Sequence, residues 1–465
     1  MNKLMLNDLI KGLPTGEDKD RYSDIQHFTL KNDITTIVLD DDPTGTQTVH
    51  GIPVLTQWSA PLIEQELSNK TPLFFILTNS RSLHEDAAVL LNKEIGEMIC
   101  QASRKTNRKV RIISRSDSTL RGHYPAEVDA LKIALCLEES AEILIPAFYQ
   151  GGRYTIQDIH YVEENGILIP AAETPFARDK SFGYTSSNLI DWIVEKRGNS
   201  ITRERIGSIS LEEIRRYDID SIMKKLENPN YSALVINVVT ENDLKVVVLA
   251  LLKAENNGKK FIYRTASSII PVITGIIPKP ILDIDDFNLD KDSGGLIVVG
   301  SYVPKSTEQL NFLLQNENVI PCELKVEDFL EENDQNLMDE IARDITRLLS
   351  LGKNPMLYTS RELITGKDKA ESLEIINKVA GSVNYIISRV AIKPRFVIAK
   401  GGITSSDIAV KCFGVTRAQV AGQILPGVPV WELDGKWEGL TYVVFPGNVG
   451  TEDSLSQAFR KLNTK

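Results

Sequence analysis

The chain has 465 residues, of which 42% are hydrophobic and 25% are charged, and its formal net charge is −10. This composition is typical of a globular protein with two or three domains, and the excess of acidic residues argues against a nucleic-acid partner. The longest apolar run, residues 246–252, is only about a third of a membrane span, so no membrane partner is expected. The four scattered cysteines form no C-x-x-C pair and predict free thiols in a reducing, cytoplasmic compartment.

The most informative segment follows a polar extension, residues 1–32. Residues 35–39 are β-branched and apolar and predict a buried strand, which runs directly into Asp40, Asp41 and Asp42. Ligands of α/β sheets bind at the carboxyl ends of strands, and three adjacent acids there repel one another unless a cation, a substrate hydroxyl or a shared proton relieves them. The pattern indicates an active site, although a solvated turn capped by Asp42 would have the same sequence.

Strand and helix patterns then alternate as far as residue 285, with arginines at or just after the strand ends. Guanidinium groups bind carboxylates bidentately, so several arginines in strand-end loops of an acidic protein favour an anion pocket over separate surface ion pairs. Asp117 is predicted to orient an arginine or to bind a substrate hydroxyl. The arginines in question are Arg81, Arg115, Arg121, Arg153 and Arg264.

Residues 281–295 are rich in aspartate and resemble a linker, so the domain boundary is predicted near residue 290. A second alternating set follows, with strands expected at residues 296–299, 319–324, 356–358, 396–399 and 442–445. The sequence therefore predicts an α/β fold with a first domain at 33–285 and a second at 293–465. Each is expected to be a mostly parallel sheet flanked by helices.

Three glycine-rich loops follow strands of the second domain. They are Gly300-Ser301, Gly401-Gly402 and the segment Gly447-Asn448-Val449-Gly450. Thr404, Ser405 or Ser406 is expected to cap the helix after the second loop. Glycines let the backbone approach a ligand, and unpaired N–H groups at helix starts attract phosphate. The loops match neither a P-loop nor a dinucleotide fingerprint, so they predict a nucleotide site without a nicotinamide cofactor.

An acid- and arginine-rich pocket in one domain and phosphate-binding loops in the other fit phosphoryl transfer. A carboxylate, here Asp41 or Asp42, would accept the hydroxyl proton while cations and N–H groups stabilise the transferred group.

Together the motifs resemble the four-carbon acid sugar kinase family, ATP-dependent enzymes that phosphorylate tetronates such as erythronate and threonate and their oxo derivatives. The likeness runs in order from about residue 34 to residue 463. It implies a substrate site around Asp41, Asp42, Arg81, Asp117 and Arg121, in a cleft between two α/β domains. It also implies that Ser301, Gly402, Gly447, Asn448, Val449 and Gly450 contact ATP, with Gly401 and Thr404 in the same loops. The matching segments are Asp41-Asp42-Pro43-Thr44-Gly45, Asn79-Ser80-Arg81-Ser82, Asp117 to Gly122, Pro146-Ala147-Phe148 with Gly152-Arg153, Thr174 to Ala177, Phe182 to Tyr184, Arg264, Gly300-Ser301, Gly401-Gly402 with Thr404-Ser405, Pro426 to Pro429, and Gly447 to Gly450.

Arg115, His123, Pro125 and Ile403 depart from the commoner family pattern, which leaves the identity of the acid open. The expected activity is transfer of the γ-phosphoryl group of MgATP to a hydroxyl of a tetronate or 3-oxo-tetronate, with Mg²⁺ shared with the nucleotide rather than caged by protein. One alternative is a sugar-acid-binding regulator without turnover. An oxidoreductase or aldolase is disfavoured by the missing dinucleotide fingerprint. A homo-oligomer is compatible with the sequence.

Overall fold

A computed structural model describes residues 4–16, 19–287, 289, 292–326, 335–361 and 369–464, with the backbone alone at 369–374 and 376. The chain divides into two compact units, Met1–Thr48 with Trp58–Pro278 and Val49–Gln57 with Lys279–Lys465. Both units are α/β, as the strand and helix patterns predict. The short segment 49–57 belongs to the second unit, a feature that the strand pattern does not reveal.

The first unit is built on a parallel sheet with the strand order β3-β1-β4-β11-β5-β10-β9. Its middle strands are apolar runs buried on both faces, as expected for a sheet covered by helices. Asp40 pairs in register with Leu77 and Arg115, and Arg115 pairs with Thr265. The carboxyl ends of four strands therefore meet at one edge. The strands are β1 (Ile34–Asp40), β3 (Leu73–Leu77), β4 (Lys109–Arg115), β5 (Ala141–Ile145), β9 (Ile206–Ile209), β10 (Ala233–Ile236) and β11 (Phe261–Thr265).

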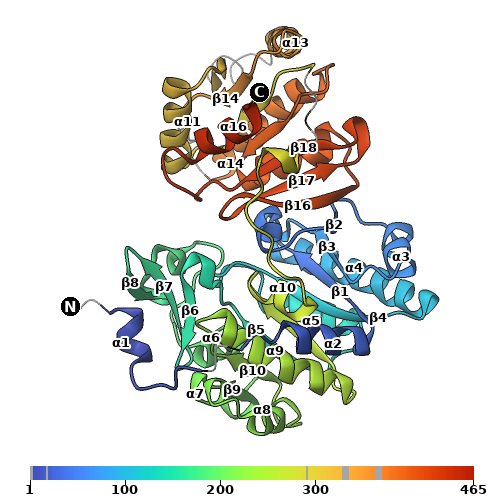
Figure 1. Ribbon diagram of the computed structural model, residues 1–465, viewed down its shortest axis with the longest axis vertical. Helices are drawn as coiled ribbons and strands as arrows, with labels where there is room; N and C mark the ends of the chain where they lie inside the picture. Colours follow the sequence, from blue (N-terminus) through green and yellow to red (C-terminus); the bar gives the residue numbers. More distant parts are fainter. Residues whose placement is uncertain are drawn as a thin grey trace. The chain divides into compact units, whose positions relative to one another are not determined.

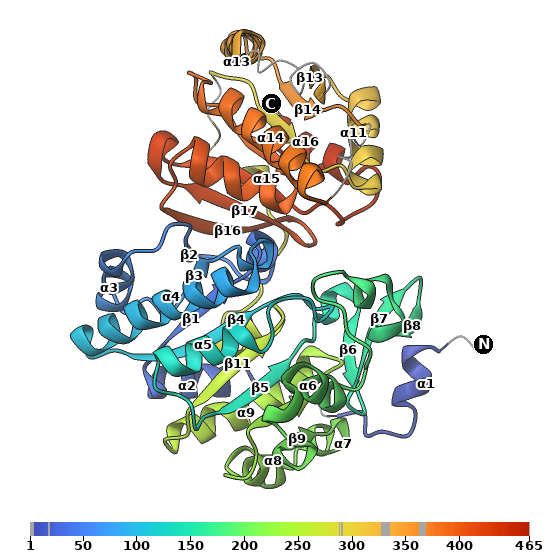
Figure 2. The ribbon, with the colours of Figure 1, turned by 180° about the vertical axis from the view of Figure 1, so that it is seen from behind.

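Helices cover both faces of this sheet (Figures 1 and 2). One face carries α2 (Tyr22–Asn32), α9 (Glu241–Asn256) and α10 (Ile269–Thr274), and the other carries α3 (Ala60–Ser68), α4 (Glu85–Thr106) and α5 (Ala126–Ala134). Thr240 and Asp243 form a reciprocal capping box that fixes the start of α9. The remaining helices of the unit are α1 (Leu6–Ile10), α6 (Leu189–Arg197), α7 (Leu211–Arg215) and α8 (Ile219–Leu226).

A small antiparallel sheet, β6 (Arg153–Ile156), β7 (Ile159–Glu164) and β8 (Ile167–Pro170), was not predicted. The sequence feature that indicates this sheet is the Asn165-Gly166 pair between β7 and β8. Both residues have positive φ, as a two-residue hairpin turn requires. Apolar side chains of the N-terminal segment pack on this sheet, and Leu168 N donates to Leu4 O at 2.8 Å. The N-terminal extension is thus part of the first unit.

The second unit contains a mixed sheet with the order β13-β14-β12-β15-β18-β17-β16-β2. The strands from β13 to β18 in this order are parallel, and β17, β16 and β2 are antiparallel additions. The predicted strands are present, but the β16–β17 hairpin was expected only as a loop motif. The strands are β2 (Ile52–Leu55), β12 (Leu296–Val299), β13 (Ile320–Leu324), β14 (Pro355–Thr359), β15 (Val397–Lys400), β16 (Arg417–Leu425), β17 (Val428–Leu433) and β18 (Leu440–Phe445).

Two helix layers enclose this second sheet (Figures 1 and 2). Leucines of α11 (Pro304–Asn316) and α16 (Ser454–Asn463) share one apolar core with β12 and β18. The other face carries α14 (Lys369–Ser388) and α15 (Gly402–Asp407), and α13 (Gln335–Ser350) packs against α14. Among the residues that the structure describes, no helix combines the length and the apolar character of a membrane span.

Candidate functional site

Asp40 is the last residue of β1, as predicted, and its side chain is buried. Its Oδ1 atom accepts a hydrogen bond from Arg115 Nη1 at 2.8 Å. The effect of burial on the pKa of Asp40 is larger than the opposing effect of the Arg115 charge, and it raises this pKa to about 7. A Cβ atom on Gly45 would come within 1.9 Å of Asp40 Oδ2, so the turn after the acid triplet can close only with glycine at this position.

Asp41 is held from several sides. Arg81 binds it bidentately, with Nη2 2.5 Å from Oδ1 and Nε 3.2 Å from Oδ2, and Ser116 Oγ donates to Oδ2 at 2.6 Å. Its side chain is only 3% exposed. Strong donors thus occupy both oxygens and fix the orientation of this carboxylate.

Asp42 is the most accessible carboxylate of the triplet, with a side chain that is 26% exposed. Its Oδ1 atom accepts from Thr44 N at 2.8 Å and Thr44 Oγ1 at 2.5 Å, so it caps the 3-10 turn Pro43–Thr48, as the alternative interpretation expected. Its Oδ2 atom lies 3.5 Å from Arg81 Nη1. Burial would raise the pKa of Asp42, but Arg81, Arg115 and the Thr44 hydrogen bonds outweigh it and lower the pKa. Asp42 is therefore ionised, and its partly exposed Oδ2 atom makes only one long contact, with Arg81, so it can still meet a ligand.

The loop after β4 carries a second pair, in which Arg121 Nε donates to Asp117 Oδ2 at 2.6 Å. Burial would raise the pKa of Asp117, but Arg81, Arg121 and the Thr119 hydroxyl lower it. The Arg121 guanidinium also lies 5.0 Å from the centre of the Phe176 ring, within the distance of a cation–π contact. Asp117 therefore orients Arg121, one of the two roles predicted for it.

Arg264 and Arg153 differ in their partners. Arg264, on β11, donates from Nη1 to Ser114 Oγ at 2.8 Å and to Glu127 Oε2 at 2.9 Å. Arg153, at the start of β6, donates to the Gly151 carbonyl oxygen, and its Nε atom is buried without a hydrogen bond. Within the described ranges no carboxylate lies within ion-pair distance of Arg153. Burial lowers its pKa, and Asp117 and Arg121 act on it through their charges.

The structure brings most of the predicted acid-site residues together. Asp41, Asp42, Arg81 and Arg115 form one network of contacts. A cavity of about 10 Å³, room for about one water molecule, is lined by Asp117, Arg121 and Arg264 together with Ser116, Leu120, Leu144, Pro146, Trp192 and Thr265. Sequence reasoning missed two residues that hold this network, Ser116 and Glu127. Ser116 directly precedes the motif from Asp117 to Gly122, whereas Glu127 has no local signal apart from its place in an apolar helix.

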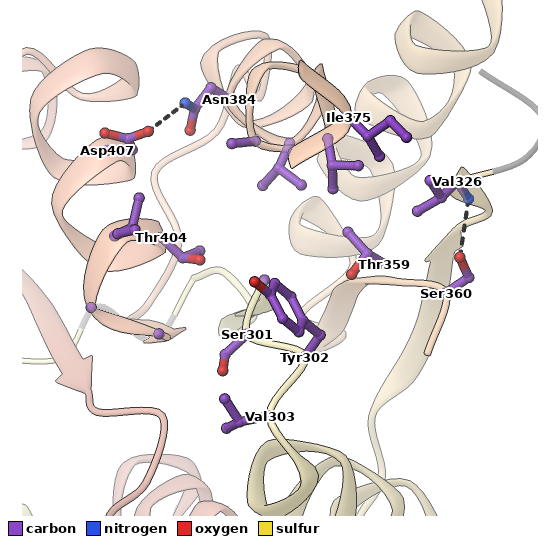
Figure 3. A pocket seen from close by; sticks show the side chains of 17 residues that line it. Ser301, Tyr302, Val303, Val326, Thr359, Ser360, Ile375, Asn384, Thr404 and Asp407 are labelled. Carbon is purple, nitrogen blue, oxygen red and sulfur yellow. Dashed lines mark hydrogen bonds between the residues drawn. The ribbon is translucent and has the colours of Figure 1, made fainter. Parts of the chain in front are cut away.

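A larger cavity of about 300 Å³ lies in the second unit (Figure 3). The predicted residues Ser301, Gly401, Gly402 and Thr404 line one side. In Figure 3 Tyr302 lies near the centre of the view, and Ile375 and Asn384 from α14 lie above it. Sequence reasoning missed the wall made by α14, because its apolar positions look like ordinary core. The other lining residues are Gly300, Val303, Val326, Thr359, Ser360, Val379, Ala380, Val383, Ile403 and Asp407.

The predicted cap of the helix after Gly401-Gly402 is wrong. The helix α15 begins at Gly402, and Gly401 is the N-cap residue with φ 120°, a conformation that suits glycine. Thr404, Ser405 and Ser406 therefore lie inside the helix. A Cβ atom on Gly300 would come within 2.3 Å of Thr404 Oγ1, so the close approach of these two loops depends on glycine at position 300.

The third predicted loop, Gly447, Asn448, Val449 and Gly450, does not line this cavity but adjoins it. Ser306 Oγ lies 3.0 Å from Ser301 Oγ and 3.1 Å from the Gly447 carbonyl oxygen. Ser301, on the cavity wall, is thus connected to the loop through a single side chain. In the part of the chain that the structure describes, no three His, Cys, Asp or Glu side chains come together in a way that could hold a metal ion.

Comparison with known proteins identifies both units. Residues 36–272 match the sugar-binding N-terminal domain, and residues 296–455 match the nucleotide-binding C-terminal domain. These two domains define a class of two-domain sugar-acid kinases. The chain belongs to the four-carbon acid sugar kinase family, as its motifs predict.

Individual relatives are distant. A D-threonate kinase of Bordetella bronchiseptica is 31% identical over 139 residues, which cover 29% of this chain and 32% of that protein. The match thus spans about a third of the curated relative. A crystal structure from Salmonella typhimurium LT2, provisionally described as a tRNA synthase, aligns with a TM-score of 0.68 at 17% identity over 93% of this chain and 100% of that chain. The Haemophilus influenzae protein HI1011 aligns with a TM-score of 0.62 at 18% identity over 92% and 100%. These two structures share the fold.

Proposed function

We propose that this protein is an ATP-dependent kinase that transfers the γ-phosphoryl group to a hydroxyl of a four-carbon sugar acid of the tetronate or 3-oxo-tetronate type. The single observation that carries the proposal is Asp42, an ionised and partly open carboxylate beside Arg81 at the strand ends of a sugar-binding domain. The partial similarity to a D-threonate kinase supports this substrate class.

Arg153 is proposed to bind the carboxylate of the acid, with Arg121 beside it. The Arg81, Arg115, Arg121 and Arg264 side chains already pair with protein carboxylates. Arg153 has no such partner in the described residues, so a substrate carboxylate would supply the missing counter-charge. The buried Nε atom of Arg153, which has no hydrogen bond, is a further donor for this anion.

Asp42 is proposed as the proton acceptor. Donors already occupy both oxygens of Asp41, whereas Asp42 Oδ2 faces only Arg81, at 3.5 Å. The acceptor hydroxyl oxygen bonds to the γ-phosphorus, the bond to the β-phosphate oxygen breaks to release ADP, and the hydroxyl proton passes to Asp42. A carboxylate with a low pKa suffices, because little negative charge develops on the attacking oxygen in a loose transition state.

The nucleotide is proposed to bind through the cavity of the second unit and the adjoining loop at residues 447–450. The cavity has an apolar wall from α14 and a polar wall from Ser301 and Thr404, a combination that suits a base and ribose. The site carboxylates Asp40, Asp41, Asp42 and Asp117 already pair with arginines. Mg²⁺ is therefore proposed to bind the nucleotide phosphates, where it would neutralise their charge.

The direct test is a coupled assay of ADP release with ATP, Mg²⁺ and a panel of four-carbon acids, together with thermal shifts for each ligand. Release of ADP with at least one tetronate is expected. Binding of an acid without ADP release would favour the regulator alternative. Absence of both ADP release and any ATP-induced thermal shift would reject the proposal.

A further inference from the structure

Side chains from two other elements hold almost every carbonyl group of the loop from Pro446 to Thr451. Lys400 Nζ, at the end of β15, donates to the carbonyl oxygens of Pro446 at 2.8 Å and Gly447 at 3.2 Å. Gln309 Nε2, on α11, donates to the carbonyl oxygens of residues 449 and 451 at 3.0 and 2.7 Å, and Lys305 Nζ donates to that of residue 450 at 3.2 Å. The carbonyl groups of this loop therefore point toward α11 and β15.

This arrangement directs the N–H groups of the loop the other way. In a trans peptide the C=O and the following N–H point in opposite directions, and the peptide bonds of this loop are trans. The N–H groups of Gly447, Asn448 and Gly450 therefore point away from the side chains that hold the carbonyls. None of the N–H groups of residues 447–450 donates a hydrogen bond within the described part of the chain, and Asn448 and Gly450 are exposed. Successive free N–H groups of this kind form a concave anion-binding site.

Lys400 is an unusual residue to hold a loop. It is fully buried, lies 4.3 Å from the centre of the Phe445 ring, and has no carboxylate within ion-pair distance in the described ranges. Burial and the nearby Lys305 lower the pKa of Lys400 to about 7. A buried cation without a counter-ion costs free energy that a neutral donor would not. Arg361 adds to the positive charge, because its Nη2 atom donates to the Ser301 carbonyl oxygen at 2.6 Å and its Nη1 atom is buried without a hydrogen bond. An anion at the loop would supply the missing counter-charge.

We propose that Lys400 is a positioning residue of the nucleotide site: it holds the carbonyl groups of Pro446 and Gly447 so that the N–H groups of Gly447 and Asn448 bind a phosphate group of the nucleotide. Lys305 and Gln309 complete the same arrangement for the rest of the loop. This inference rests on the proposed function and adds the residues that shape the phosphate site. If Lys400 served only for packing, its substitution would weaken the binding of every ligand of the second unit. In the proposed role, its substitution weakens only the binding of ligands that carry phosphate.

The test compares ATP with adenosine, which has no phosphate. Calorimetry would measure the affinity of each ligand for the full-length wild type and for the variants K400M, K305M and K436M. Lys436 is the matched control, since its Nζ also donates to two carbonyl oxygens, those of Ser388 and Val390, and lies 4.6 Å from the centre of the Trp437 ring. We expect K400M to lose about tenfold or more in ATP affinity and to keep adenosine affinity within about twofold, while K436M changes neither.

K305M is the substitute variant if K400M does not fold. Lys305 lies at the surface, so its substitution should not prevent folding. A selective loss of ATP affinity of about threefold is expected for it, from one weaker tether and one lost charge. Hydrogen exchange adds a structural readout: ATP should slow exchange in residues 446–451 of the wild type and not of K400M. Unchanged ATP affinity in K400M, or an equal loss for ATP and adenosine, would overturn the inference alone. A wild type that binds no ATP would instead overturn the proposed function.

Discussion

The two candidate sites of this protein differ in how their positively charged side chains are paired. In the first unit Arg81 and Arg115 pair with Asp41 and Asp40 at 2.5 and 2.8 Å. In the second unit Lys305, Lys400 and Arg361 contact backbone carbonyl groups and, within the described ranges, no carboxylate. The first site is nearly neutral and held rigid by charged pairs, which suits a small hydroxylated acid. The second carries unbalanced positive charge in a chain whose net charge is −10, which suits a polyanion such as a nucleotide.

The largest expected effect concerns Asp42, the most exposed carboxylate of the acid triplet. Asp42→Asn should lower kcat by about 100- to 10,000-fold, because the amide cannot accept the proton, and should leave ATP affinity and the KM for the acid nearly unchanged. The asparagine oxygen can still cap Thr44, so the turn should persist. Steady-state kinetics with the preferred acid would measure both constants. More than a tenth of the wild-type kcat would show that Asp42 is not the base.

The next effect concerns the ion pair between Arg81 and Asp41. Arg81→Met leaves Asp41 buried without its main partner and should lower the free energy of unfolding by about 3–5 kcal/mol, as measured by urea denaturation. The double variant R81M/D41N removes both charges and should recover part of the loss. Equal stability of wild type and R81M would mean that charge pairing does not hold the first site in place.

A smaller effect concerns Arg153, the predicted site arginine that has no carboxylate partner among the described residues. Arg153→Ala should raise the KM for the acid by about tenfold, since a charge-assisted contact to the substrate is lost, with little change in kcat. The control is Arg203→Ala, which removes an exposed arginine of the same unit that pairs with Asp191. An unchanged KM in R153A would assign substrate binding to the paired arginines instead.

The last prediction concerns how the stability of the second unit depends on pH. The pKa of Lys400 is lowered from its ordinary value of 10.5 to about 7, so between these values the unfolded chain holds a proton that the folded protein does not. The contribution of Lys400 to the free energy of unfolding should therefore rise with pH through this window and stay constant below it. Denaturation of wild type and K400M at several pH values would measure the difference between the two curves, with K436M as the control. Parallel curves for wild type and K400M would contradict the assignment.

Much of the first site follows from local sequence. The β-branched run before Asp40 makes a buried strand, and because parallel strands end at one edge, residues after different strands meet there. This is why Asp41, Arg81 and Arg115 could be predicted as neighbours although 40 and 74 positions separate the arginines from the acid. The glycine loops of the second unit were found in the same way. The nucleotide cavity was only half predicted, because the apolar side chains of α14 carry no local sign of what they face.

Sequence by itself therefore determined the two α/β units, the strand ends and the residue types gathered there, since periodicity and turn chemistry are local properties. Tertiary structure alone decided that Asp41 is enclosed by Arg81 and Ser116 while the Asp42 side chain stays 26% exposed. It also decided that residues 49–57 add a strand to the second unit and that Lys400 is buried under the loop at 446–447. The reason is physical. The partner and the solvent exposure of a charged group depend on segments distant in the chain, and only the packed structure brings these together.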